Sequence, residues 1–415
     1  MRADLRALLD AVEAAPPVQA VEVLAIELAA LVGASDVTFL IADFTGDALI
    51  RFVTAPAVEP SSGEHRAPDH LAEVPLTGSP YELALRAQRV HVEGANGTTR
   101  LYAPVTDRGD ALGVLELSLP TPPDEETIEF VASAAHALAY VIIANRRHTD
   151  LFETGQRSVP FSLAAEIQRR LLPAAFTCEA AEFTVAGWLE PAADIGGDTF
   201  DYSVERDCLH VSISDGKGHT VAAAQLATLA VGSLRNSRRS QAGVVGQAAA
   251  ANEALSLHAG DEDFVSALLL RIDLSSGAAA AVNAGHPLPY LVRDGTVTSL
   301  EFSADLPFGV LRETTYQEQA ITLQPGDRLV LVTDGMLERN AASIDIAKAL
   351  IDMGHLHPRE VVHTFARAVI GATGGDLEDD ATVLCIDWYG NRAEGVGRVS
   401  SAGATQSRAS APEDG

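Results

Sequence analysis

Four aspartates between residues 198 and 379 share a setting that suits metal chemistry. Each lies beside glycine or another acid at the end of an expected element: Asp198 in IGGDTFDY, Asp215 in SISDGKGH, Asp334 in LVLVTDGMLE and Asp379 in EDDATVLCID. One Asp-Gly pair is usually only a turn. Here Asp215 and Asp334 both follow an apolar strand, and the design recurs within one region. If the strand ends converge, these carboxylates would repel one another unless cations lay between them.

The residue types favour hard divalent cations. Oxygen ligands without histidine or cysteine select Mg²⁺ or Mn²⁺ over Zn²⁺. Two such ions about 3.5–4 Å apart could share a hydroxide that attacks phosphorus in line, with no nucleophile from the protein. Gly216 directly follows Asp215, and Gly218 lies two residues further on. Both glycines would let the backbone approach such a metal centre closely. The pattern therefore predicts a two-metal hydrolytic site.

The elements around these aspartates predict a β-rich domain over residues 174–390. In CLHVSIS, the apolar residues Leu209, Val211 and Ile213 alternate with polar ones, which is the period of a strand buried on one face. Several strands follow one another without helices, and the helices come in blocks, so a mostly antiparallel α+β sandwich is favoured over a doubly wound sheet. Strands are expected over 183–189, 208–214, 264–272, 278–283, 288–292, 321–323, 328–333 and 381–388, and helices over 221–234, 243–257, 344–353 and 359–371.

Residues 1–147 predict a separate α/β domain. Ser79 and Pro80 form a start signal for a short helix. Acidic residues near Asp124 suit the first turn of a long final helix. The expected order is a helix over 18–32, strands over 36–42 and 48–54, a helix over 79–88, a hairpin over 101–119 and the long helix.

Residues 148–173 are expected to form a helical linker, interrupted at Gly155 and Pro160. Its second helix, over 162–172, carries an apolar stripe that includes Leu163, Ile167 and Leu171. Two interpretations remain open: the stripe packs on the following domain, or it forms a dimer or signalling contact. Residues 391–415 have the low-complexity composition of a disordered tail.

Composition limits the partners and the compartment. The chain of 415 residues has 57 acidic and 29 basic residues, a net charge of −28. This balance argues against nucleic acid and anionic lipid as main partners, because both attract basic surfaces. Three widely spaced cysteines without a CxxC pattern fit reduced thiols. No signal peptide is recognised, and the apolar run over 132–144 is shorter than the roughly 20 residues of a membrane span. We expect a cytoplasmic protein.

A set of ordered motifs resembles the PPM metal-dependent serine/threonine protein phosphatases. The resemblance is closest to the bacterial branch typified by stage II sporulation protein E and the stress-response phosphatases, and it covers residues 165–388. Such proteins have an α-β-β-α sandwich as their catalytic domain. The motifs, in chain order, are AEIQRRLLP, IGGDTFDY, ISDGKGH, VNAGHPLPY, LPFGV, ITLQPGDRLVLVTDGMLER and DDATVL.

The resemblance implies roles for the aspartates, with Mn²⁺ or Mg²⁺ as two ions. Asp215 would bridge both ions, and Gly216 would offer its carbonyl. Asp198 would hold the second ion directly or through water, and Asp334 and Asp379 would hold the first. Asp215 and Asp198 would thus be the catalytic pair.

Several positions near these motifs have two readings. Asp380 is one step from Asp379 and could be the ligand instead. Thr220 stands where the branch usually has glycine, which could tighten the turn or shift the helix start.

Four more polar residues nearby could support the chemistry or only the fold. Lys217 or His219 could contact phosphate or assist the leaving oxygen, or could simply be solvated. His286 could stabilise a turn or take part in catalysis, and Asp201 is expected to support the site or the fold.

The first domain resembles a GAF sensory domain. GSPYELALRAQRVHV is similar to the short helix and following strand of that family, and LYAPVTDRGDALGVLELSL to its final hairpin. The region has no cysteine, so a thioether-linked bilin is excluded. No ligand is predicted for it.

Together these features predict a signalling enzyme, a GAF-regulated phosphatase that hydrolyses phosphoserine or phosphothreonine. The resemblance implies a homodimer and a phosphorylated anti-sigma-factor antagonist as substrate, in a bacterial stress response. The main alternative is a catalytically silent pseudophosphatase that serves as a binding scaffold. A two-metal phosphodiesterase is a second alternative, which the acidic composition and the ordered motifs disfavour.

Overall fold

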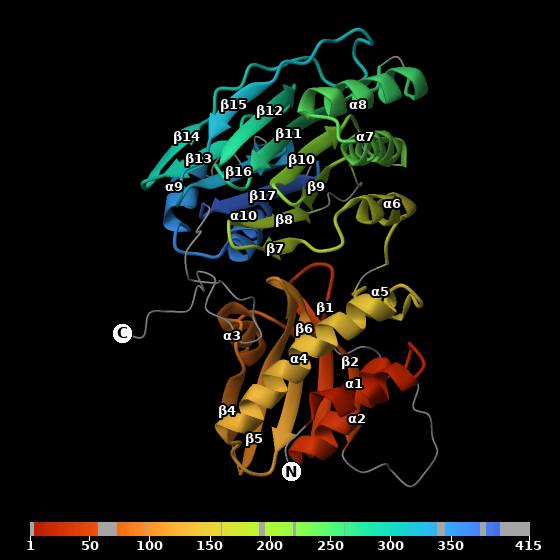
Figure 1. The fold of residues 1–415 in the computed structure, drawn as a ribbon, viewed down its shortest axis with the longest axis vertical. Helices are drawn as coiled ribbons and strands as arrows, with labels where there is room; N and C mark the ends of the chain where they lie inside the picture. The colour runs from red at the N-terminus through yellow and green to blue at the C-terminus, as the bar shows by residue number, and fades with distance from the viewer. Residues whose placement is uncertain are drawn as a thin grey trace. The chain divides into compact units, whose positions relative to one another are not determined.

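The computed structural model (Figure 1) divides the chain into two compact units, Met1–Pro160 and Phe161–Val396. The described residues are 4–56, 73–95, 97–158, 160–190, 196–218, 221–260, 262–337, 345–373 and 379–390. The predicted disordered tail over 391–415, together with His219 and Thr220, lies outside them.

A sheet of six antiparallel strands forms the centre of the first unit, in the order β3-β2-β1-β6-β5-β4. Alternating side chains of β1 and β6 face opposite sides of this sheet, as the strand period requires. The strands are β1 (Asp36–Ala42), β2 (Ala48–Pro56), β3 (Glu73–Pro75), β4 (His91–Ala95), β5 (Thr98–Asp107) and β6 (Asp110–Leu119).

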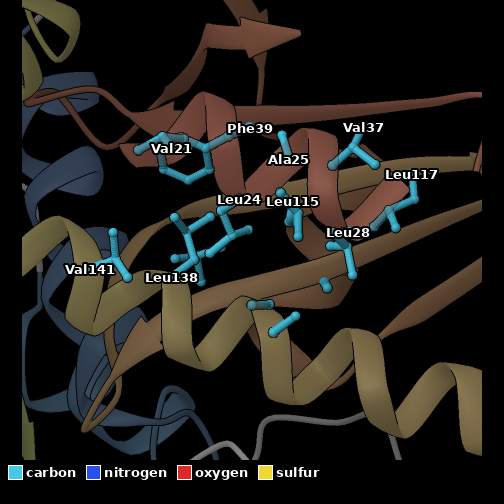
Figure 2. Packing of buried hydrophobic residues seen from close by; sticks show 14 of the residues in the cluster. Val21, Leu24, Ala25, Leu28, Val37, Phe39, Leu115, Leu117, Leu138 and Val141 are labelled. Atoms are coloured by element: carbon cyan, nitrogen blue, oxygen red, sulfur yellow. The ribbon is translucent and has the colours of Figure 1, made fainter. Parts of the chain in front are cut away.

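Helices cover both faces of this sheet. Figure 2 shows the larger core, where Leu24 and Leu28 of α2 and Leu138 of α4 pack against Phe39 of β1 and Leu115 of β6. On the other face, α3 forms a smaller core with the sheet. The helices are α1 (Leu5–Ala14), α2 (Ala20–Val32), α3 (Pro80–Ala87), α4 (Glu125–Asn145) and α5 (Leu151–Gly155).

The predicted helix starts at Ser79 and Asp124 are confirmed. The Ser79 hydroxyl accepts a hydrogen bond from the Glu82 N–H at 3.2 Å, and the Asp124 carboxylate accepts one from the Thr127 N–H at 2.9 Å. Each cap satisfies a backbone donor that the helix itself cannot pair. In the predicted linker, α4 has already ended at Asn145, and the separate short helix α5 ends at Gly155.

Helix α4 differs from the expectation about membrane-spanning length. It has 21 residues and is long and apolar enough, by length and composition, to cross a membrane, whereas the run over 132–144 alone is not. Val131, Ala135, Leu138 and Ile142 are buried in the core of the first unit. Packing of a core helix therefore accounts for this composition.

The second unit is a four-layered α-β-β-α sandwich, as predicted. One antiparallel sheet has the order β15-β12-β11-β10-β9, and the other has the order β14-β13-β16-β17-β8-β7. Between them lies a core that includes Val211 and Ile213 of β10 and Leu331 and Ile386 of the other sheet. Helices α7 and α8 cover the first sheet, and α9 and α10 cover the second (Figure 1).

Most predicted elements of this unit are present within a few residues. Strand β17 has the predicted bounds, whereas β7, β9 and β14 were not predicted. The strands are β7 (Thr177–Glu179), β8 (Phe183–Glu190), β9 (Thr199–Val204), β10 (Cys208–Gly216), β11 (Val265–Asp273), β12 (Ala278–Ala284), β13 (Tyr290–Arg293), β14 (Thr296–Ser299), β15 (Gln319–Thr322), β16 (Arg328–Val332) and β17 (Ala381–Trp388). The helices are α6 (Leu163–Leu171), α7 (Val221–Arg239), α8 (Val244–His258), η1 (Asp334–Leu337), α9 (Ile346–Asp352) and α10 (Pro358–Thr373).

Helix α6 begins at the predicted cap but buries a different face. The Ser162 hydroxyl accepts a hydrogen bond from the Ala165 N–H at 3.1 Å. The buried positions are Ala164 and Gln168, while Leu163 is 66 % exposed. Packing on its own domain therefore does not explain the Leu163 end of the apolar stripe.

Candidate metal centre

Strand β10 of the first sheet carries Asp215 near its C-terminal end. It is an inner strand, and its register places Asp215 opposite Ser266 of β11. Beyond it, the Gly216 N–H donates to the Gly197 carbonyl at 3.2 Å, which draws the segment before β9 over the end of β10. A Cβ atom on Gly197 would collide with the Gly216 carbonyl. This close approach of two backbones therefore requires glycine.

Asp198 joins the ends of the two sheets. It is 1 % exposed and directly precedes β9. Its Oδ2 accepts hydrogen bonds from the Thr333 and Thr382 hydroxyls, both at 2.7 Å. Thr333 follows β16, and Thr382 lies at the start of β17. One carboxylate of the first sheet is thus held by two strands of the second.

Asp380 is the more deeply placed of the two neighbouring acids. It is fully buried, and its Oδ2 accepts hydrogen bonds from the Gly196 N–H at 3.0 Å and from Gln168 Nε2. The same Gln168 Nε2 donates to the Asp198 carbonyl at 3.0 Å. Asp379 is only half-buried, and its Oδ1 accepts from the Asp380 N–H at 2.8 Å. Helix α6 is therefore linked to two of the site's acids through one side chain.

Asp334 opens the short helix η1 and is exposed. It follows Thr333, so the chain supplies a hydroxyl for Asp198 and a carboxylate in consecutive residues. The next residue, Gly335, lies so close to the Asp380 carbonyl that a Cβ atom would not fit. This contact holds the Asp334 turn against the start of β17.

The carboxylates act on one another electrostatically. Burial raises the pKa of Asp215 to about 7, and the neighbouring charges of Asp334, Asp379 and Asp380 add to the effect. Burial also raises the pKa of Asp198 well above its usual range, with further contributions from Asp215 and Asp380, while its two hydroxyl donors oppose the rise. Buried charges of one sign are costly unless they bind a cation or a proton. The five aspartates thus form one electrostatic cluster.

The donor set fits hard cations that retain water ligands. All five side chains are carboxylates, and the Gly216 carbonyl lies beside them. Within the described ranges, no three of these aspartates place one oxygen each within 4.8 Å of one another. The arrangement is therefore open rather than a closed cage. An open all-oxygen set suits Mg²⁺ and Mn²⁺, since Mg²⁺ in particular keeps several waters when bound to protein.

His286 lies in a buried turn beside the cluster. Its Nδ1 is 2.9 Å from the Ser266 hydroxyl, and the Asn283 side chain accepts from its N–H and donates to its carbonyl at 2.7 and 3.0 Å. Burial lowers the pKa of His286 to about 3, so the ring is neutral. These contacts support the turn-stabilising reading of this residue.

The structure shows the contacts of Lys217 and Asp201, two residues whose roles the sequence left open. Lys217 Nζ donates to the Glu262 carbonyl at 2.9 Å and lies 5.6 Å from the centre of the Phe264 ring. Asp201 accepts two hydrogen bonds from Arg235 of α7, at 2.9 and 3.1 Å. Asp201 therefore anchors a helix to the sheet, which is the fold-supporting role.

Sequence analysis missed the polar residues that hold the acids in place. Gln168, Thr333 and Thr382 all bond to Asp198, and Gln168 also bonds to Asp380. A signal was available for two of them, because Thr333 and Thr382 are hydroxyl residues at the ends of otherwise apolar strands. Gln168 is a polar residue within the AEIQRRLLP motif and is 3 % exposed.

Known proteins match this chain mainly over the second unit. Residues 205–389 match the sequence model of the stage II sporulation protein E (SpoIIE) family. The stage II sporulation protein E of Bacillus subtilis is 26 % identical over 139 residues, which is 32 % of this chain and 17 % of that protein. The match thus spans well under a quarter of that relative.

Three solved structures show partial similarity. The RsbU and RsbW domains of a Mycobacterium tuberculosis protein are 23 % identical, with 53 % of this chain and 63 % of that chain covered and a TM-score of 0.45. The SiaA-PP2C domain of Pseudomonas aeruginosa is 22 % identical, with 49 % and 85 % covered and a TM-score of 0.42. The phosphatase domain of Bacillus subtilis SpoIIE with a regulatory fragment is 16 % identical, with 74 % and 83 % covered and a TM-score of 0.45.

The family match and the acid cluster concern the same part of the chain, since Asp215, Asp334, Asp379 and Asp380 all lie within the matched segment. The segment that resembles the SpoIIE family over residues 205–389 is therefore the segment that carries four of the five clustered aspartates.

Proposed function

We propose that the second unit is a metal-dependent phosphatase that removes phosphate from phosphoserine or phosphothreonine in a protein. The carrying observation is the carboxylate cluster, in which burial and the neighbouring acids raise the pKa values of Asp198 and Asp215. Such a cluster has no role in an apolar core, where it costs stability, but it is suited to binding cations. Its place in a SpoIIE-family domain supports phosphate ester hydrolysis as the chemistry.

Two Mn²⁺ or Mg²⁺ ions are proposed as cofactors. Asp215 and the Gly216 carbonyl, Asp198, Asp334 and Asp379 would hold them. When bound, such ions activate water and neutralise charge on the transferred phosphoryl group. The protein holds the ligands in place through Thr333 and Thr382 on Asp198 and through the short backbone contact at Gly197.

The contacts of Asp380 support Asp379 as the ligand of the two. Asp380 Oδ2 already accepts two hydrogen bonds, from Gly196 and Gln168, whereas Asp379 is half-buried beside the cluster. We therefore assign Asp380 to holding the Gly196–Gly197 segment and α6.

The test is phosphate release by the purified full chain. After treatment with a chelator, the protein is expected to hydrolyse p-nitrophenyl phosphate only when Mn²⁺ or Mg²⁺ is restored. Activity that survives thorough removal of metal would exclude this mechanism. A folded protein that binds Mn²⁺ but releases no phosphate from this ester or from phosphorylated proteins would instead establish the pseudophosphatase alternative.

The substrate and the control of the enzyme form the finer part of the proposal. The SpoIIE resemblance supports a phosphorylated anti-sigma-factor antagonist as substrate, and a cytoplasmic homodimer as the working form. Residues 1–147 would act as a GAF-like sensor, 148–173 as a linker and 174–390 as the catalytic domain. Gln168 supports control through α6, because it bonds to Asp380 and to the Asp198 backbone while Leu163 stays exposed on the same helix.

A further inference from the structure

A second group of potential metal ligands lies at the opposite end of β10 from Asp215. Cys208 and His210 are two residues apart on this strand, so their side chains project from the same face. Leu209 and Val211 project into the core between the sheets, so Cys208 and His210 face the α7 side. Glu205 lies in the preceding turn, which is closed by a hydrogen bond from the Glu205 N–H to the Cys208 carbonyl at 2.8 Å.

The three side chains converge to distances typical of ligands around one ion. Cys208 Sγ is 3.5 Å from His210 Nε2 and 3.8 Å from Glu205 Oε2, and His210 Nε2 is 3.6 Å from Glu205 Oε1. A tetrahedral zinc ion with one sulfur, one nitrogen and one oxygen ligand separates these atoms by about 3.4–3.6 Å. Within the part of the chain that the structure describes, this is the one group of three such ligands that converges this closely.

The hydrogen bonds inside the cluster are long, at 3.5 and 3.8 Å, and both involve Cys208 Sγ. The separation of His210 Nε2 from Glu205 is longer than an N–H···O hydrogen bond. His210 is 6 % exposed, and its Nδ1 has no hydrogen-bond partner. Cys208 is fully buried, whereas the Glu205 side chain is 31 % exposed. His210 Nε2, the nitrogen that faces Cys208 and Glu205, would be the atom that binds an ion, and the partly exposed Glu205 carboxylate gives that ion access from solvent.

We infer that Glu205, Cys208 and His210 bind one zinc-class transition-metal ion, with water as the fourth ligand. Thiolate and imidazole ligands select Zn²⁺ or Co²⁺ over the hard ions that suit the aspartate cluster. On binding, the Cys208 thiol loses its proton to solvent, His210 binds as the neutral ring and Glu205 as the carboxylate.

This site is separate from the candidate catalytic centre. Asp215 lies seven positions after Cys208 on β10, which corresponds to roughly 23 Å along the strand. The ion would tie the β9–β10 turn to the body of β10. Its loss is therefore expected to leave phosphate release unchanged, so this proposal stands or falls independently of the phosphatase function.

Cobalt distinguishes the two sites because only one of them contains sulfur. Metal-free full-length protein is titrated with Co²⁺ and followed in the near ultraviolet, where a thiolate bound to Co²⁺ gives a charge-transfer band. The band is expected to saturate at one Co²⁺ per chain, to disappear with one equivalent of Zn²⁺ and to persist in Asp215→Asn. Folded wild-type protein without this band would overturn the proposal.

Matched variants assign the ligands. Cys208→Ser is expected to lose the band, whereas Cys178→Ser, at a half-buried cysteine of the same unit, keeps it. Glu205→Gln retains the thiolate and is partly exposed, so it should fold, keep the band and bind Co²⁺ at least about tenfold more weakly. A full band in Cys208→Ser, or unchanged affinity in Glu205→Gln, would refute the assignment.

Discussion

The buried aspartates of the second unit lie in two opposite electrostatic settings. Asp387 accepts hydrogen bonds from Arg328 at 2.6 and 3.0 Å, and both side chains are at most 5 % exposed. Asp201 is paired in the same manner with Arg235. Asp198 and Asp215, by contrast, face other carboxylates, which raise their pKa values. The fold can therefore neutralise a buried acid with arginine, and at one place it does not.

The two settings predict opposite effects on stability when one charged group is removed. Removing one partner of a buried ion pair leaves an uncompensated charge and destabilises the protein. Removing one member of a group of like charges relieves repulsion. Paired aspartates are thus expected to matter for stability and clustered aspartates for activity. The predictions below test this division.

The largest expected effect is the loss of turnover in Asp215→Asn. We expect Mn²⁺-dependent hydrolysis of p-nitrophenyl phosphate to fall below about one hundredth of the wild-type rate, because a carboxylate proposed to hold the ions would be lost. Asp334→Asn and Asp379→Asn should behave alike. In chelator, Asp215→Asn should unfold at the same or a higher temperature than wild type. Turnover above a few per cent in this variant would contradict its assigned role.

Breaking the Arg328–Asp387 pair should mainly reduce the stability of the protein. Arg328→Met is expected to lower the free energy of unfolding by about 3–5 kcal/mol, because Asp387 remains buried and charged. Urea unfolding can be followed by tryptophan fluorescence, since both tryptophans lie in the second unit. The control is Lys348→Ala, which breaks an exposed pair with Asp352 and should cost at most about 1 kcal/mol. Equal losses in the two variants would remove the distinction.

The raised pKa of Asp215 predicts a pH dependence in metal-free protein. Between the ordinary value of about 3.9 and the folded value of about 7, the folded state holds this proton and the unfolded state does not. The contribution of Asp215 to stability is therefore highest at low pH and falls as pH rises through this window. Asp215→Asn should gain stability relative to wild type from pH 4 to pH 7 in chelator. A constant difference across this range would show that the carboxylate is not protonated there.

The close backbone contact at Gly197 predicts a smaller, geometric effect. Gly197→Ala should force the segment before β9 away from Gly216 and reduce turnover by about tenfold, with the ligands themselves intact. Gly232→Ala in α7 is the matched control, since a Cβ atom there meets no neighbour. It should keep full turnover and gain slight stability from its helix propensity. Equal turnover in both variants would show that the contact does not position the ligands.

The smallest effect is expected on α6. Replacing Leu163 and Ile167 by glutamine should change basal turnover a few-fold and alter dimerisation together, because Gln168 on the same helix bonds to Asp380. Sedimentation of the full chain and Mn²⁺-dependent turnover measure the two quantities. If the folded double variant changes neither, the stripe has no regulatory role.

The order of elements could be predicted from sequence wherever one pattern dominated. Strand β17 has the predicted bounds because ATVLCIDW is a nearly continuous apolar run. Strand β9 was missed although TFDYSV alternates apolar and polar residues as CLHVSIS does, and all six of its residues pair with β10. Of the α6 stripe, whose packing was left open between its own domain and a partner, Leu163 is exposed while Ile167 and Leu171 are half-buried, and Ala164 and Gln168 occupy the most buried positions.

The candidate site, too, could be predicted from the sequence only in part. Asp215, Asp334 and Asp379 could be predicted because each stands at the end of a predicted strand, and Asp198 because it follows two glycines in IGGDTFDY. The hydrogen bond from Thr382 to Asp198 joins residues 184 positions apart, and it depends on how two sheets align. Which of Asp379 and Asp380 lies deeper depends on the register at the start of β17. No local pattern specifies either arrangement.

The place of β17 in its sheet has a consequence for the newly made protein. This strand is the last of the unit in sequence, yet it lies between β16 and β8 and hydrogen-bonds to both. Until it leaves the ribosome, β16 and β8 each expose an edge that other chains can pair with. Asp198 also lacks the Thr382 hydroxyl during this interval. The unit is therefore expected to depend on chaperones most strongly just before synthesis passes Trp388, and to become able to bind its ions only afterwards.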